Sequence, residues 1–179
     1  KRQGRPQYED MGVSYICTSG EKLPHYIESI TSAHPIESTF LRGIVDALNA
    51  EVALGSVTSL DDGISWLGFT YLFTRLCKAP RVYGLDAHDF EADPTLTQRR
   101  RQWITSAANI LAQHQMVEFD LAAGTLRPTN MGRIASRYYL SHKTVGVFHE
   151  RLRNNLVEAD ALSLMSRAAD FDQIPLRET

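Results

Sequence analysis

The hydrophobic residues of this chain recur mostly at the spacing of an α-helix. In residues 39–55, the apolar side chains of Leu41, Leu48 and Val52 share one face, and Gly55 ends the run. Comparable patterns predict further helices over residues 21–32, 58–80, 95–113, 130–140, 141–152 and 156–171. The pattern therefore predicts a mainly α-helical chain.

Polar residues mark where two of these helices begin. Ser59 followed by Asp62 resembles a capping box at the start of the third predicted helix. Asp93 followed by Pro94 predicts a cap with proline at the first helical position of the fourth. The third helix is apolar nearly all round, which is typical of a helix at the centre of a domain.

Alternating residues predict one β-hairpin over residues 116–129. Val117, Phe119 and Leu121 alternate with acidic residues, and Gly124 supplies the turn. Three helices followed by a hairpin is the element order of a winged helix-turn-helix domain.

The two ends of the chain carry elements without partners. Residues 12–19 have the pattern of a buried strand and precede helix 21–32, as in the last unit of an α/β domain, with a linker at 34–39. An isolated strand cannot satisfy its backbone, and the two last helices have wide apolar faces. We therefore expect a piece of a larger protein. Its fold class is mainly α with a small β-hairpin: a winged helix-turn-helix flanked by a partial α/β remnant and a partial helical domain.

Composition says more about where in the cell the protein is found than about the chemistry that it performs. The net charge of −2 lacks the strong basic excess of a protein that grips phosphate over its whole surface. Cys17 and Cys77 form neither a disulfide framework nor a zinc spacing. No apolar run reaches the roughly 18 residues of a membrane helix. These features predict an intracellular protein, nuclear or cytoplasmic, without a membrane span.

Motifs for catalysis and metal binding are missing from the sequence. No glycine is followed by lysine, so the chain has no Gly-x4-Gly-Lys-Ser/Thr phosphate loop. The acidic stretch 82–93 lacks the central glycine and final glutamate of a calcium loop, and no histidine pairs with cysteine at zinc spacing. We therefore predict no metal or cofactor in this chain, and no ATPase activity of the chain alone.

Two pairs of arginines are candidates for contact with nucleic acid. Arg99 and Arg101 lie early in helix 95–113, the position that reads the major groove in many winged helices. Arg133 and Arg137 share one helix face and are followed by two tyrosines, which could hold a single strand by charge and stacking. For the first pair, the alternative is a solvated or salt-bridged face, which the acidic residues of the hairpin favour. For the second pair, the alternative is that the tyrosines pack in the core and the arginines pair with acidic residues of a neighbouring domain.

Longer motifs, in the same order, resemble one family. The chain is similar over essentially its whole length to the tandem-cassette helicases of superfamily two in the motifs GRPQY, HPIEST, ALNAEVALGSVTS, WLGFTYLFTR and GRIASRYYL. The stretches ICTSGEKLPHYI and DPTLTQRRR resemble the branch of the activating signal cointegrator complex more than the spliceosomal branch. The resemblance implies that residues 1–38 end a second RecA-like motor domain and form a linker, that 39–140 are the winged helix, and that 141–179 begin a helical ratchet domain.

The resemblance also implies a role for the first residues. A family motif reads Gly-Arg-Ala-Gly-Arg-Pro-Gln where this chain has KRQGRPQ, so Arg2 and Arg5 match its ATP-sensing arginines. Lys1 and Gln3 depart from the glycine and alanine of that motif. ATP and Mg²⁺ would belong to the parent helicase. The implied partners are its RecA-like and ratchet domains, an RNA or DNA strand, and the proteins of a multi-subunit complex.

Together these features predict a fragment of an ATP-dependent helicase that acts on RNA. Its winged helix would brace the motor and ratchet domains during unwinding and would not be catalytic alone. One alternative is a free-standing winged helix that binds nucleic acid, with the four candidate arginines converging on one surface. Another is a protein-interaction module that uses the apolar faces near Leu162 and Phe171.

Overall fold

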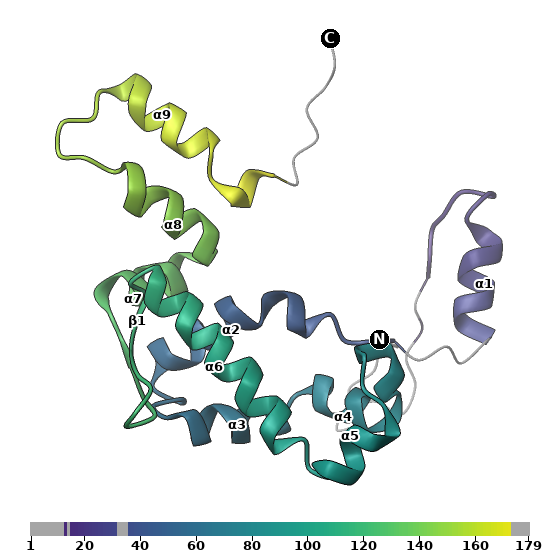
Figure 1. Ribbon diagram of the computed structural model, residues 1–179. Helices are drawn as coiled ribbons and strands as arrows, with labels where there is room; N and C mark the ends of the chain where they lie inside the picture. Colours follow the sequence, from purple (N-terminus) through teal and green to yellow (C-terminus); the bar gives the residue numbers. More distant parts are fainter. Residues whose placement is uncertain (1–12, 14, 32–35, 173–179) are drawn as a thin grey trace. The chain divides into compact units, whose positions relative to one another are not determined.

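The structure, a computed structural model, describes residues 13, 15–31 and 36–172, and the chain forms two compact units, residues 1–36 and 37–179 (Figure 1). In the first unit, helix α1 (Leu23–Thr31) confirms the helix predicted over 21–32. None of its residues is buried, because its apolar side chains have no core to enter within this unit.

The strand predicted over residues 12–19 is wrong for this chain. Residue 13 and residues 15–19 form no regular secondary structure, and Tyr15 is 89% exposed. A β-strand needs a hydrogen-bonded neighbour, and in the described residues the only ladder joins two strands of the second unit.

The second unit is mainly helical with one short sheet. Its elements, in chain order, are η1 (Phe40–Gly43), α2 (Ile44–Leu54), α3 (Leu60–Gly68), α4 (Tyr71–Lys78), η2 (Pro80–Tyr83), α5 (Ala87–Ala92), α6 (Thr97–Gln113), β1 (Val117–Asp120), β2 (Thr125–Pro128), α7 (Asn130–Tyr138), α8 (His142–Arg151), α9 (Glu158–Ser166) and η3 (Ala169–Phe171). The helix over 39–55 therefore begins as a 3-10 turn, and Gly55, with φ of 81°, ends α2 as predicted.

The predicted hairpin forms and takes its place in a winged-helix sheet. Strands β1 and β2 pair antiparallel, with Gly124 in the turn at φ of 67°. Ser59, just before α3, adds an isolated bridge to Thr125 of β2. One strand position between the first two helices, followed by the hairpin after the third, is the arrangement of a winged helix-turn-helix domain.

The core of this unit lies around the long helix α6, which packs against both α2 and α3 (Figure 1). Leu48 of α2, Leu67 of α3 and Leu111 of α6 are fully buried. Burying a side chain of this kind contributes about 2 kcal/mol to the free energy of folding, so this cluster holds the three helices together.

The long helix predicted over 58–80 is divided into α3 and α4. Ser59 caps α3 as predicted, since its hydroxyl accepts a hydrogen bond from the Asp62 amide at 3.1 Å. Thr70 is a second cap, because its hydroxyl accepts from the Phe73 amide and thereby starts a new helix. The break exposes Phe69, which is 92% accessible. The stretch Gly68–Phe69–Thr70 is therefore a stop-and-start signal inside a continuous apolar pattern.

The predicted start of the helix over 95–113 is wrong in detail. Pro94 lies outside α6, and Leu96 adopts a left-handed conformation with φ of 53° just before the helix. Asp93 still caps it, because its carboxylate accepts from the amides of Thr97 at 2.9 Å and Gln98 at 2.7 Å. The acidic stretch 82–93 before it contains the short helix α5.

The last predicted helix, over 156–171, ends earlier than expected. Helix α9 stops at Ser166, and residues after it form the 3-10 turn η3. Helix α8 begins as predicted at Ser141, whose hydroxyl accepts from the Thr144 amide at 3.3 Å. In the described part of this segment few apolar side chains are buried, and Leu162 and Phe171 stay largely exposed.

Candidate interdomain and nucleic-acid surfaces

The arginines predicted to sense ATP, Arg2 and Arg5, lie outside the residues that the structure describes. Their proposed role therefore stays a prediction. The other four candidate arginines all lie in the second unit, on α6 and α7.

The three consecutive arginines at the start of α6 are engaged in contacts inside the domain. The Nη2 atom of Arg101 lies 2.7 Å from the Asp61 carboxylate, and that of Arg99 lies 3.8 Å from Asp89. Both pairs join α6 to elements that precede it in the chain. These cations are therefore partly neutralised by their neighbours before any phosphate arrives.

Arg100 of the same run turns inward. Its guanidinium donates to the Ile64 carbonyl oxygen at 2.6 Å and to the Thr95 carbonyl oxygen at 3.0 Å, and it lies 4.8 Å from the centre of the Phe73 ring. These contacts tie α6 to α3 and α4, so Arg100 is a structural residue.

The hairpin presents negative charge. Glu118 and Asp120 of β1 are both exposed, and Arg127 is the β2 residue opposite Glu118. The Asp120 carboxylate also accepts from the amides of Ala122 and Ala123 and so stabilises the turn. A wing with this charge repels a phosphate backbone, as expected from the sequence.

The two remaining candidates, Arg133 and Arg137, line one groove between α2 and α7. Both are exposed, and Tyr139 beside them is 92% accessible. Of the features predicted for holding a strand, the structure therefore brings two cations and one aromatic ring together at this groove. Their role in binding stays a prediction.

The structure does not bring all four candidate arginines to one surface. Helix α7 starts where α6 ends, because the Thr129 hydroxyl donates to the carbonyl oxygens of Gln115 and Met116. Arg99 and Arg101 are in the first turns of α6. A helix rises about 1.5 Å per residue, so roughly 20 Å of α6 separates its first turns from the start of α7.

Two of the motifs that resemble the helicase family, LNAEVALG and GRIASRYYL, contact each other. Asn49 of the first donates from Nδ2 to the carbonyl oxygen of Gly132 in the second, at 3.0 Å. A Cβ at Gly132 would lie 2.0 Å from the Met116 carbonyl oxygen, so only glycine fits there. These motifs are thus explained by the close packing of α2 on α7.

A cluster of four residues fastens the start of the second unit to its helices. We call it the Glu37 cluster, and it consists of Glu37, Ser38, Arg75 and Tyr83. Arg75 donates to both carboxylate oxygens of Glu37, at 2.6 Å and 3.2 Å. The Tyr83 hydroxyl donates to Glu37 at 2.8 Å and accepts from the Ser38 amide at 2.8 Å.

The contacts of this cluster change the acidity of its members. The hydrogen bond from Arg75 is the largest cause that lowers the pKa of Glu37, and the Tyr83 hydroxyl adds to it. Burial, followed by the neighbouring carboxylate, raises the pKa of Tyr83. Glu37 therefore stays ionised and holds the chain against α4 and η2.

A second cluster fastens the other side of the domain to α8. We call it the Asp46 cluster, and it consists of Asp46, Ser141, His142, Thr144 and Asp170. The backbone amide of His142 donates to the Asp46 carboxylate at 2.7 Å, and its ring Nδ1 lies 3.0 Å from the same oxygen. Asp170 accepts from the Ser141 amide, and its own amide donates to the Thr144 hydroxyl.

Close packing supports this second cluster. A Cβ at Gly146 of α8 would lie 2.7 Å from the His114 ring, at the end of α6. Thr144 and Val145 are almost completely buried. Helix α8 therefore contacts the winged helix through both side-chain hydrogen bonds and direct packing.

Sequence reasoning missed both clusters. The one usable signal was Arg75, a charged residue within the apolar run 64–77, because a buried guanidinium requires an acidic partner. That partner lies 38 positions earlier, and Asp46 lies 96 positions before His142. Neither separation has a sequence signature.

The described residues were also searched for a metal site and for a membrane-spanning helix. Among the described residues, no three histidine, cysteine, aspartate or glutamate side chains gather where they could hold a metal ion. Within the same residues, no helix has the length and apolar character needed to cross a membrane.

Comparison with known families agrees with this architecture. Residues 37–113 match the family described as a winged helix-turn-helix domain, and residues 128–179 match the family described as the Sec63 Brl domain. The class of protein is therefore a winged helix-turn-helix joined to a Sec63-type helical segment. The Asp46 cluster links a residue of the first match to residues of the second.

Individual relatives place the chain more closely. It is 38% identical over 177 residues to activating signal cointegrator 1 complex subunit 3 of Bos taurus, and 43% identical over 178 residues to RQC trigger complex helicase SLH1 of Saccharomyces cerevisiae. Each alignment covers 99% of this chain but only 8% and 9% of the relative. Over nearly its whole length, the chain is therefore similar to the winged-helix and Sec63-type segments of these larger proteins.

Proposed function

We propose that this region belongs to an ATP-dependent RNA helicase and braces its motor domain against its ratchet domain during unwinding. Two findings support the proposal: the similarity to a protein named as a helicase, and the order of the two family matches along the chain. A brace has to be fixed at both sides, because a joint that bends absorbs movement that should reach the strand.

The observation that carries the proposal is that each side of the winged helix is fastened by its own cluster. The Glu37 cluster holds the segment that follows residues 1–36, and the Asp46 cluster holds the first helix of the Sec63-type segment. Both clusters include a carboxylate that accepts two or more hydrogen bonds, so each is charge-assisted and directional.

Nucleotide chemistry would belong to the rest of the parent protein. This chain has no Gly-x4-Gly-Lys-Ser/Thr motif to hold phosphates, so its described residues do not fit an ATP and Mg²⁺ site. The partners would be the RecA-like and ratchet domains, an RNA strand and the proteins of a multi-subunit complex. The setting would be the nucleus or cytoplasm.

The pairing at the start of α6 argues against a free-standing reader of nucleic acid. In such a module the exposed cations of this helix contact phosphates and bases. Here Arg101 and Arg99 contact Asp61 and Asp89, and the hairpin is acidic.

The proposal is tested by loosening one side of the brace in the complete helicase. Asp46→Ala removes the acceptor for the His142 amide and ring, so α8 is no longer held to α2 by hydrogen bonds. We expect strand-stimulated ATP hydrolysis to stay within about twofold of wild type, while duplex unwinding falls by about fivefold or more. Both rates are measured on the same preparation.

Asp61→Ala is the matched control, because it removes an exposed aspartate of the same domain that pairs with Arg101 and belongs to neither cluster. It should leave both rates unchanged. Equal loss of hydrolysis and unwinding in Asp46→Ala, or no loss of either, contradicts the bracing role.

A further inference from the structure

A groove with small apolar side chains runs between α2 and α7 of the winged helix. Its volume is about 880 Å³, and the small side chains are those of Ala50 and Ala53 from α2 and Ala135 from α7. The lining residues of α2 extend from Asp46 to Leu54, a rise of about 12 Å along the helix. A groove of this kind fits an α-helix, because small side chains let two helices approach closely.

The two helices that form the groove run in opposite directions. Asn49 of α2 donates to the carbonyl oxygen of Gly132 near the start of α7, whereas Asp46, about one turn earlier, accepts from the first residue of α8, just beyond the end of α7. The end of α2 therefore lies beside the start of α7. It follows that Leu54 and Tyr139, two exposed large side chains of the lining, lie at opposite ends of the groove.

The exposed ring of Tyr139 is held on a strained backbone. Its φ of 58° is left-handed, a conformation that a bulky side chain rarely adopts and that glycine adopts without strain. The residue is nevertheless 92% exposed, so contacts with the described residues do not offset the strain. Leu54 is 78% exposed at the other end. Strained positions and exposed aromatic rings are typical of contact sites, and a segment lying in the groove would cover both side chains.

Two arginines on the α7 side of the groove have no acidic partner among the described residues. Arg133 and Arg137 are four positions apart, so they share a helix face and lie about 6 Å apart along its axis. The ion pairs in the described part of the chain involve other side chains. The aspartates of the lining, Asp46 and Asp170, already accept hydrogen bonds from backbone amides at the start of α8. What the groove lacks is therefore a pair of carboxylates for its arginines.

We propose that this groove binds an amphipathic helix of a partner protein, with two carboxylates about one turn apart at the edge of its apolar face. Carboxylates at positions i and i+4 of such a helix match the spacing of Arg133 and Arg137, and each can accept a pair of N–H donors from one guanidinium. Its small side chains would lie over the alanines, and its larger ones against Leu54 and Tyr139. The inference does not depend on the bracing role, which rests on the Glu37 and Asp46 clusters.

The lining favours a protein helix over a nucleic-acid strand. Two arginines and two aspartates give it a formal charge of zero. A strand carries a negative charge at every nucleotide, so it would place phosphates beside the aspartates as well as beside the arginines. A helix carries its charges at separate positions and can present carboxylates to the arginines alone. The lining also has a single aromatic residue, Tyr139, so successive bases would have no series of rings on which to stack.

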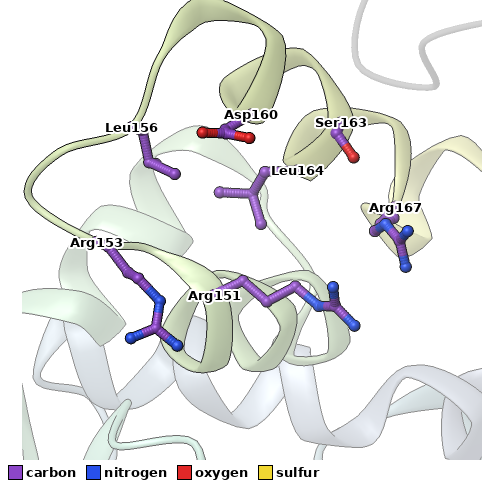
Figure 2. Close-up of a pocket in the computed structure, with 7 residues that line it drawn as sticks. All are labelled: Arg151, Arg153, Leu156, Asp160, Ser163, Leu164 and Arg167. Carbon is purple, nitrogen blue, oxygen red and sulfur yellow. The ribbon is translucent and has the colours of Figure 1, made fainter.

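A pocket in the next segment supplies matched control residues. We call it the α8–α9 pocket, and Figure 2 shows Arg151 on its α8 side and Arg167 on its α9 side, with Leu164 between them. These two arginines are also exposed, and they too lack an acidic partner in the part of the chain that the structure describes. Neither lines the groove. Reversing their charges therefore changes the net charge of the chain as much as reversing Arg133 and Arg137 does.

The test measures fluorescence anisotropy of a labelled helical peptide with the full 179-residue chain. The peptide has about 18 residues, with alanine and leucine on one face and two glutamates four positions apart at its edge. We expect Arg133→Glu with Arg137→Glu to lower the affinity by about tenfold, and Arg151→Glu with Arg167→Glu to change it by no more than about twofold. A peptide with lysines in place of the glutamates should bind the first variant about fivefold more tightly than it binds wild type, which a folding defect would not produce.

Two single variants test the tyrosine at the end of the groove. Tyr139→Gly should keep the fold, because glycine suits the left-handed position, and should lower the affinity for the peptide by about fivefold. Tyr138→Ala removes an exposed ring that does not line the groove, so it should change the affinity by no more than about twofold. Circular dichroism checks that each variant is folded.

Equal losses in the groove and control variants overturn the proposal, and so does undetectable binding by the wild-type chain. Displacement of the peptide by oligouridylate of equal charge and at equal concentration also overturns it, because the groove would then accept a nucleic-acid strand. The complete helicase should bind the peptide as tightly as the 179-residue chain does. Binding by the shorter chain alone would overturn the assignment to a partner protein, because a segment of the helicase itself would then cover the groove.

Discussion

The arginines of the winged helix and those of the α8–α9 segment are used in different ways. In the winged helix, Arg75 and Arg101 contact carboxylates and Arg100 contacts backbone carbonyl oxygens. Around the α8–α9 pocket, Arg151 and Arg167 have no acidic partner among the residues described. The contrast is therefore between arginines that pack against acceptors inside the winged helix and arginines of the α8–α9 segment that do not.

This difference teaches that a run of basic residues is a poor guide to unpaired cations. The three consecutive arginines 99–101 are the most conspicuous basic feature of the sequence, yet all three make contacts inside the domain. The pocket arginines are scattered over 151–167 and become neighbours only because α9 folds back along α8. Availability depends on what lies beside a charge, not on how many charges are adjacent in the chain.

Removing the inward arginine should have the largest effect on stability. Arg100→Ala leaves the carbonyl oxygens of Ile64 and Thr95 without their donor and removes a contact with Phe73. We expect a loss of about 2–3 kcal/mol in the free energy of unfolding, measured by urea denaturation. Arg167→Ala, in the pocket, should change it by no more than about 0.5 kcal/mol. Similar losses in the two variants would erase the difference between the regions.

The Glu37–Arg75 pair should make the stability of the winged helix depend on pH. The pKa of Glu37 is lowered below its ordinary value of 4.5, so the folded state binds a proton less readily than the unfolded state. The stabilisation is then complete above about pH 4.5 and is lost as the pH falls through the lower folded pKa. Urea midpoints of wild type and Glu37→Gln should therefore differ at neutral pH and converge toward acid.

Asp62 also has a lowered pKa, through hydrogen bonds from Thr58 and Ser59, but it is present in both proteins and cancels in the comparison. A constant difference between the two midpoints across the acid range would show that the charge of Glu37 contributes nothing.

The exposed pair at the start of α6 should matter least to stability. Asp61→Asn removes the charge opposite Arg101, and because both side chains are well exposed we expect a change within about 0.5 kcal/mol by thermal denaturation. The freed arginine should raise the affinity for a labelled duplex by no more than about threefold. A tenfold gain would mean that the ion pair with Asp61 is all that prevents α6 from binding nucleic acid.

Much of the fold follows from local patterns. The helical spacing of Leu41, Leu48 and Val52 locates α2, and the alternation around Phe119 locates the hairpin. The caps Ser59 and Ser141 act where they were predicted, because a cap is satisfied by residues only three positions away. The strand predicted over 12–19 was wrong for the opposite reason, since pairing depends on a distant partner.

The candidate sites were less predictable than the fold. Arg133 and Arg137 do meet at one groove, as their spacing of four residues implied. The Glu37 and Asp46 clusters could not be foreseen, because each joins residues that are dozens of positions apart. The pocket arginines carry no motif at all.

The sequence by itself determined most of the helices, the hairpin turn at Gly124 and the similarity to proteins named as helicases, since these depend on neighbours along the chain or on long ordered motifs. The tertiary structure decided which charged side chains are paired and which are free. Electrostatic interaction falls with distance in space, so the state of Arg101 or Arg151 depends on whether packing brings a carboxylate within a few ångströms.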